Sequence, residues 1–147
     1  MFPVARSRVE LMAKISKTDD KWKAELTAEQ YRVTRESGTE MPFSGAYDQH
    51  WDRGQYLCVC CGHPLFSSDS KFNAGCGWPS FHGELEEANV VQRPDYSGGM
   101  SRIELLCCHC DAHLGHIFPD GPPPTGLRYC INSASLVFRE DDNESEA

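Results

Sequence analysis

The sequence predicts a mainly β fold in which antiparallel sheet lies behind a short helical segment at the N-terminal end. Short runs of β-forming residues are separated by turns rich in glycine and proline, at 55–59, 90–93, 102–107, 127–131 and 135–138. A capping signal near residue 27 marks the helix. A chain of 147 residues that is 39% hydrophobic is also the size of one ordinary domain with its own core.

The helix signal begins at Thr27. Thr27 at the N-cap and Gln30 three residues later form a capping box, so we expect a helix over about 28–36. Gly38 lies where a glycine in the left-handed conformation ends many helices. Residues 39–54 are rich in glycine, proline, serine and aromatic residues without a helical or strand period, and we expect an ordered loop there.

The two ends of the chain lack core signals. Apolar periodicity is thin in residues 1–24, so we expect a weakly ordered extension with at most a short helix through Trp22. The apolar run of a secretory signal is missing from this segment. Residues 25–139 then form a single domain. Acidic residues crowd into 140–147 without apolar periodicity, which predicts a disordered tail.

Charge and composition exclude several classes of protein. The 14 basic and 22 acidic residues give a net charge of −8, which is the wrong sign for a protein that neutralises nucleic-acid phosphates. No run approaches the roughly 20 apolar residues that a membrane span needs. Eight cysteines with paired spacing and no signal peptide favour metal and redox use in a reducing compartment. We therefore expect a cytoplasmic protein that binds neither nucleic acid nor membrane.

Two Cys-x-x-Cys pairs predict a metal site. Together they supply four thiolates, the full tetrahedral shell of one structural zinc ion, with no open position for chemistry. The pairs enclose the long interval 62–106, so a metal here would staple a large loop. Cys60 and Cys108 offer competing ligands, and only one choice gives both pairs the same two-residue gap. The ligands of that choice are Cys58, Cys61, Cys107 and Cys110.

Two cysteines remain outside both pairs. Cys76 lies between two glycines, which permit a tight or left-handed backbone and so a reachable thiol. Cys130 lies in an expected strand, where Arg128 and Asn132 point to the same face. A guanidinium beside a thiol favours the nucleophilic thiolate, and an amide can hydrogen-bond a polar substrate atom. The alternative is that Cys130 is a small buried apolar residue.

Two histidines favour an active site over that alternative. His113 and His116 follow the second cysteine pair within a few residues, in a chain with two unclamped cysteines. Two other classes stay open at this point. A zinc module that only binds a protein partner would need no reactive thiols at Cys76 and Cys130. A zinc-dependent hydrolase would use the two histidines as metal ligands, and would lose activity on chelation without unfolding.

Three motifs, over residues 75–81, 107–118 and 128–136, resemble the B-type methionine sulfoxide reductases, and the similarity runs from about residue 26 to 138. The resemblance implies a fold of two antiparallel sheets, stabilised by a four-cysteine zinc. It also implies reduction of the R epimer of methionine sulfoxide, free or in oxidised proteins, with thioredoxin as the reductant.

The same resemblance implies roles for the site residues. Cys130 is expected to be the nucleophile, which becomes a sulfenic acid as methionine departs, and Cys76 the resolving thiol that forms a disulfide with it. Further residues match the family's pocket: His113, His116 and Asn132 on its polar side, Arg128 just ahead of the nucleophile, and Trp78 and Phe118 as the apolar wall for the substrate's methyl group.

Overall fold

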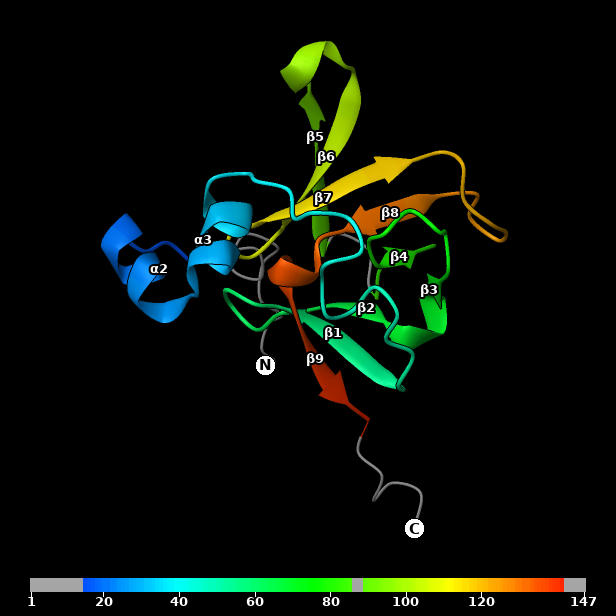
Figure 1. Ribbon diagram of the computed structural model, residues 1–147, viewed down its shortest axis with the longest axis horizontal. Coiled ribbons are helices and arrows are strands. Elements are labelled where there is room, and N and C mark those ends of the chain that lie inside the picture. The colour runs from blue at the N-terminus through cyan, green and yellow to red at the C-terminus, as the bar shows by residue number, and fades with distance from the viewer. Residues whose placement is uncertain (1–14, 86–88, 142–147) are drawn as a thin grey trace, which may run out of the picture.

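The computed structural model describes residues 15–85 and 89–141, and within them the predicted fold class is confirmed. One sheet has the strand order β2-β1-β9 and the other the order β3-β4-β8-β7-β6-β5, and every pairing in them is antiparallel. The helices lie together on one side, and the β5–β6 hairpin extends away from the body (Figure 1).

The elements have the following bounds. The helices are α2 (Asp19–Glu25) and α3 (Ala28–Arg35), with short 3-10 turns η1 (Ser68–Ser70), η2 (Ser97–Gly99) and η3 (Ser133–Ser135). The strands are β1 (Gly54–Cys58), β2 (Pro64–Ser67), β3 (Lys71–Phe72), β4 (Ser80–Phe81), β5 (Val90–Asp95), β6 (Arg102–Cys107), β7 (His113–Phe118), β8 (Arg128–Ile131) and β9 (Leu136–Glu140).

All five predicted strand runs form strands, whereas β2, β3, β4 and β7 were not predicted. β7 is the informative omission, since it lies inside the six-stranded sheet between β6 and β8. Five of its six residues are buried, so it lacks the alternation of buried and exposed side chains by which a strand is recognised. Strands β3 and β4 have only two residues each, too few for any periodic signal.

The predicted capping box at the start of α3 is present. The backbone N–H of Gln30 donates to Thr27 Oγ1 at 3.1 Å, and the Thr27 N–H donates to Gln30 Oε1 at 2.9 Å. The helix ends at Arg35, one residue before the expected end. Residues 39–53 contain no helix or strand, as expected for an ordered loop.

The prediction of a left-handed Gly38 is wrong. Ser37 takes that conformation instead, with φ of 57°, while Gly38 does not have a positive φ. The Gly38 N–H donates to the carbonyl of Arg32 at 3.0 Å, and a Cβ on Gly38 would lie only 2.7 Å from the Arg32 guanidinium. A glycine is needed here for close approach to the helix rather than for its backbone conformation.

The short helix expected through Trp22 is present in the N-terminal segment, as α2. Thr18 caps α2, and Trp22 of that helix is buried, with the Arg35 guanidinium 4.3 Å from its ring centroid. The aromatic side chain attaches α2 to α3 through burial and a cation–π contact. The remainder of the predicted extension, residues 1–14, lies outside the described residues.

The C-terminal boundary also differs slightly. Glu140 belongs to β9 rather than to the acidic tail, and the next residue, Asp141, donates its backbone N–H to the carbonyl of Arg53 at 3.0 Å. The rest of the predicted tail, residues 142–147, lies outside the described residues. With Glu140 included, all five residues of β9 pair with β1.

An aromatic core joins the two sheets. Tyr56 of β1, Phe66 of β2 and Phe81 of β4 are fully buried. The rings of Phe66 and Phe81 are stacked with centroids 4.4 Å apart, and Tyr56 meets Phe81 edge-on at 5.3 Å. Such aromatic pairs add stability beyond their buried area. Because β4 pairs with β8, this core also holds Cys130, which lies opposite Ser80 in that ladder.

Gly115 should be intolerant of any side chain, because a Cβ on it would overlap the carbonyl oxygen of Cys130 on the neighbouring strand. We expect Gly115→Ala to lower the free energy of unfolding by about 3 kcal/mol, the upper end of the usual cost of overpacking. Denaturant unfolding measures the change. Gly83→Ala is the control, since no heavy atom lies within 4 Å of its Cβ position. Equal stabilities of the two variants would contradict this account.

Candidate active site

A cavity of about 260 Å³ opens where β7, β8 and the loop before β4 meet. Arg128, Cys130 and Asn132 all line it, as expected, although Asn132 lies one residue past the end of β8 and Ile131 lines the cavity as well. Four further residues of the predicted site line the same cavity: Cys76, Trp78, His116 and Phe118. Residues from three distant parts of the sequence therefore share one pocket.

His113 does not line the cavity. Its side chain is buried beside the pocket, and its ring centroid lies 5.6 Å from that of His116. Four other lining residues, Thr39, Arg102, Gly115 and Ile131, were not among the predicted site residues. No motif marked Thr39 or Arg102, since Thr39 belongs to the loop after α3 and Arg102 begins an otherwise ordinary strand.

The two pocket thiols share a hydrogen bond, and its effect on the two cysteines is opposite. The bond from the Cys130 thiol lowers the pKa of Cys76 to about 5, with help from the Ser80 hydroxyl 3.5 Å away. The same bond, together with burial, raises the pKa of Cys130 well above its usual range. The two shifts favour a thiolate at Cys76 over a thiolate at Cys130.

The effect of Arg128 on the pKa of Cys130 has the expected direction but is not the largest effect. Its guanidinium does lower the pKa of Cys130, as predicted, but the bond to Cys76 and the burial of Cys130 outweigh it. Arg128 is held by Asp120, whose carboxylate accepts from Nε at 2.9 Å and from Nη2 at 3.2 Å. The same guanidinium lies 4.4 Å from the ring centroid of Phe118, which fixes its orientation beside the thiols.

Each histidine is bonded to a carboxylate of the β5–β6 hairpin. His116 Nε2 lies 2.7 Å from Asp95 Oδ2, and this bond holds the pKa of the Asp95 carboxyl well below its usual range. His113 Nδ1 lies 2.6 Å from Glu104 Oε2. Burial lowers the pKa of His113 despite that bond. The hairpin thus orients both rings, an arrangement that sequence motifs did not indicate.

Asn132 is held on both sides of its amide group. Its Oδ1 accepts the backbone N–H of Glu40 at 2.9 Å, and its Nδ2 donates to the carbonyl of Leu114 at 3.0 Å. An amide nitrogen carries two hydrogens, so one more donor remains for a molecule in the cavity. Both contacts come from outside β8, so neither could be read from the local sequence.

The four predicted metal ligands form one cluster next to β7. Their sulfur atoms lie within 4.8 Å of one another, and the cluster consists of Cys58, Cys61, Cys107 and Cys110. The sulfur atoms of Cys58 and Cys110 are 3.6 Å apart. A cluster of four thiolates can hold a metal ion. It joins the turn after β1 to the turn between β6 and β7, three residues before His113.

The hydrolase alternative is not supported by this geometry. Within residues 15–85 and 89–141, the four cysteines are the group found with metal-binding spacing, and neither His113 nor His116 belongs to it. Each histidine instead directs a ring nitrogen at a carboxylate. The metal cluster and the pocket are separate sites.

Residues 26–140 match the family model described as the SelR domain. The chain belongs to the SelR domain family. The match covers the described strands and α3, and leaves α2 outside it. Among the described residues of this SelR domain protein, no helix has the length and apolar character required to cross a membrane.

Relatives of the SelR domain protein are similar along nearly their whole length. A protein of Thiobacillus denitrificans is 59% identical over 126 residues, which cover 86% of this chain and 96% of that protein. One from Herminiimonas arsenicoxydans is 58% identical over 134 residues, covering 90% and 98%. One from Hahella chejuensis is 53% identical over 135 residues, covering 92% and 97%. All three are named peptide methionine sulfoxide reductase MsrB.

The interaction between the two pocket thiols gives a testable pH dependence for the ionisation of Cys130. In Cys76→Ser the thiolate that raises the pKa of Cys130 is gone, whereas Arg128 remains, so Cys130 should ionise at lower pH. We expect a shift of about one to two pH units, since a hydrogen bond to a charged group contributes roughly 1.5–3 kcal/mol. The measurement is the rate of alkylation of Cys130 by iodoacetamide against pH, followed by mass spectrometry.

Cys60→Ser is the matched control, because it also replaces one cysteine by serine but leaves both pocket thiols in place. Its alkylation profile at Cys130 should coincide with that of the unaltered protein. A Cys76→Ser profile that also coincides with it would show that Cys76 does not control the ionisation of Cys130.

Proposed function

We propose that this protein reduces the R epimer of methionine sulfoxide to methionine, free or within oxidised proteins. The observation that carries the proposal is the hydrogen-bonded pair Cys76 and Cys130, in a cavity that also holds His116 and two aromatic side chains. The names of its relatives in the SelR domain family support the same activity.

The reaction requires a thiolate and an acid. A sulfoxide sulfur accepts a nucleophile when its oxygen is protonated, and His116 is the cavity-lining residue with an imidazole, the side chain most often used for proton transfer. As the Cys130 sulfur attacks, its proton passes along the hydrogen bond to the Cys76 thiolate. Methionine leaves, and the sulfoxide oxygen remains on Cys130 as a sulfenic acid. Cys130 is thereby oxidised and the sulfoxide reduced by two electrons.

The second step regenerates the pair. The Cys76 thiol attacks the sulfenic acid, a disulfide forms between Cys76 and Cys130, and one water leaves. A dithiol protein such as thioredoxin then reduces this disulfide by thiol–disulfide exchange and becomes oxidised itself. Cys76 follows Gly75 and precedes Gly77, both with positive φ, so a change of side chain at either position would disturb the backbone that carries the resolving thiol.

The remaining lining residues have binding roles in this proposal. Trp78 and Phe118 form the apolar wall that receives the methyl group and thioether end of the substrate, since aromatic rings pack well against methionine-like groups. Arg128 stabilises negative charge on the thiol pair, and the free amide hydrogen of Asn132 is directed to the sulfoxide oxygen. His113 acts from outside the cavity, through its contact with the His116 ring.

Zinc is the metal that suits the four-cysteine cluster. In a tetrahedral zinc site with bonds of about 2.3 Å, the sulfur atoms are about 3.8 Å apart. The distances of 3.6 Å for Cys58 with Cys110 and 3.7 Å for Cys61 with Cys107 agree with that geometry. The bound ion would hold the two turns together and take no part in the reaction. A reducing compartment, the cytoplasm, suits both free thiols and a zinc thiolate site.

The activity test uses separated R and S epimers of methionine sulfoxide with a dithiol reductant. We expect turnover of the R epimer alone. Cys130→Ser should abolish reduction, whereas Cys76→Ser should reduce about one sulfoxide per chain and then stall with thioredoxin, with dithiothreitol restoring part of the turnover. Cys60→Ser should cycle normally. If Cys76→Ser cycles with thioredoxin at the rate of the unaltered protein, Cys76 is not the resolving thiol.

The metal test compares neighbouring cysteines. Cys58→Ser removes one of the four clustered sulfur atoms and should lose the metal and lower the melting temperature, because a structural metal contributes folding free energy. Cys60→Ser lies outside the cluster and should keep one zinc per chain. Elemental analysis and thermal unfolding provide the readouts. Metal retained in Cys58→Ser but lost in Cys60→Ser would mean that the ligand set is wrong.

A further inference from the structure

The loop after α3 borders the cavity at Thr39, and hydrogen bonds hold it on both sides of that residue. At its start, the Arg32 guanidinium donates to the carbonyl of Thr39 at 3.2 Å and is itself held by Glu29. At its far end, the Phe43 N–H donates to the carbonyl of Gly77 at 2.7 Å. Thr39 lines the cavity, so this segment, residues 38–43, borders the proposed substrate.

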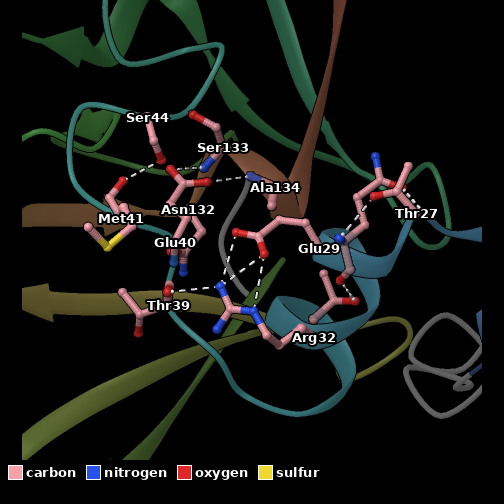
Figure 2. A network of polar contacts seen from close by, with 12 residues as sticks. Thr27, Glu29, Arg32, Thr39, Glu40, Met41, Ser44, Asn132, Ser133 and Ala134 are labelled. Atoms are coloured by element: carbon pink, nitrogen blue, oxygen red, sulfur yellow. Dashed lines mark hydrogen bonds and ion pairs between the residues drawn. The ribbon is translucent and has the colours of Figure 1, made fainter.

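Glu40, in the middle of this segment, is a buried acid, with only 3% of its surface exposed. Its carboxylate faces η3 (Figure 2). Oε2 accepts the backbone N–H of Ser133 at 2.8 Å, and Oε1 accepts that of Ala134 at 2.9 Å. These two donors immediately follow Asn132 in the chain.

The backbone of Glu40 contacts the cavity residues themselves. Its N–H donates to Asn132 Oδ1 at 2.9 Å, and its carbonyl accepts the indole N–H of Trp78 at 3.1 Å. Glu40 is therefore hydrogen-bonded to Asn132 and to Trp78 in the cavity wall, and also to the backbone that follows Asn132. Trp78 and Asn132 lie 54 positions apart in the sequence, and Glu40 bonds to both of them.

The carboxylate has little room to move. A Cβ added to Gly45 would lie 2.6 Å from Glu40 Oε2, so the loop packs directly against it. Burial raises the pKa of Glu40, and the N–H groups of Ser133 and Ala134 oppose that rise. Burial of an acid is costly, and here its two oxygens are satisfied by backbone donors rather than by a cation.

We propose that Glu40 is a positioning residue for the reduction of methionine sulfoxide, which sets the Trp78 ring and the Asn132 amide at the spacing that the substrate requires. The inference rests on the proposed function. Glu40 itself does not line the cavity, and it acts through Trp78 and Asn132. Catalysis depends on such alignment, since a displacement of about 1 Å can lower a rate roughly a hundredfold.

Glu40→Gln tests the proposal with almost no change of volume. The amide keeps one acceptor oxygen but directs an NH₂ group at a backbone N–H, so η3 and the loop should move apart. We expect kcat for methionine R-sulfoxide to fall roughly tenfold to a hundredfold, with a smaller change in KM. The Trp78 indole N–H resonance, assigned by its absence in Trp78→Phe, should shift in the ¹⁵N spectrum.

Glu36→Gln is the control, because Glu36 is an exposed acid at the C-terminal end of α3, just before the loop that carries Glu40. Its kcat and indole resonance should equal those of the unaltered protein. The indole measurement needs no activity, so it tests the positioning role even if the unaltered protein fails to reduce the R epimer, which would refute only the proposed function.

Glu40→Asp, shorter by one methylene, gives the same readouts should the Gln variant fail to fold. A folded Glu40 variant with an unchanged indole resonance and unchanged kcat would overturn the proposal. So would the failure of both variants to fold, since Glu40 would then be a general stability residue rather than one that tunes the pocket.

Discussion

The structure depends on the register between β7 and β8. Their pairing places His116 opposite Cys130 and Gly115 opposite Ile131. The strands approach so closely at Gly115 that no side chain fits between them. A slip of one residue would turn Cys130 away from the cavity and His116 away from its carboxylate. The placement of His116 beside Cys130 in the proposed site follows from this one ladder.

Two structural features anchor β7 on the side away from the cavity. The four-cysteine cluster joins the turn before β7 to the end of β1, and the Arg35 guanidinium donates to the carbonyl of Cys110 in that turn at 2.8 Å. Arg35 also covers Trp22, so α2 and α3 brace the turn. The four-cysteine cluster and the helices thus support the strand that carries His116, without entering the pocket.

Local patterns were sufficient to predict the helix start, the clustered cysteines and the cavity face of β8, because each depends on spacing within a few residues. The residues that orient the site were not predictable in this way. Asp95, Glu104 and Glu40 reach their partners through strand pairing or loop packing across long stretches of sequence. The opposite pKa shifts of Cys76 and Cys130 arise from a contact between separate segments, which the position of Arg128 ahead of Cys130 does not indicate.

The unequal thiol pair also affects how the protein withstands the oxidants that create its proposed substrate. Peroxides react with thiolates and far less with thiols, and the pKa of Cys76 is lowered whereas that of Cys130 is raised, so Cys76 is the thiol of the pair that such an oxidant should attack first. A sulfenic acid formed on Cys76 would condense with the neighbouring Cys130 thiol and release water. The product would be the same disulfide that closes the proposed reaction cycle, so an oxidising attack would end in a form that a dithiol can recover.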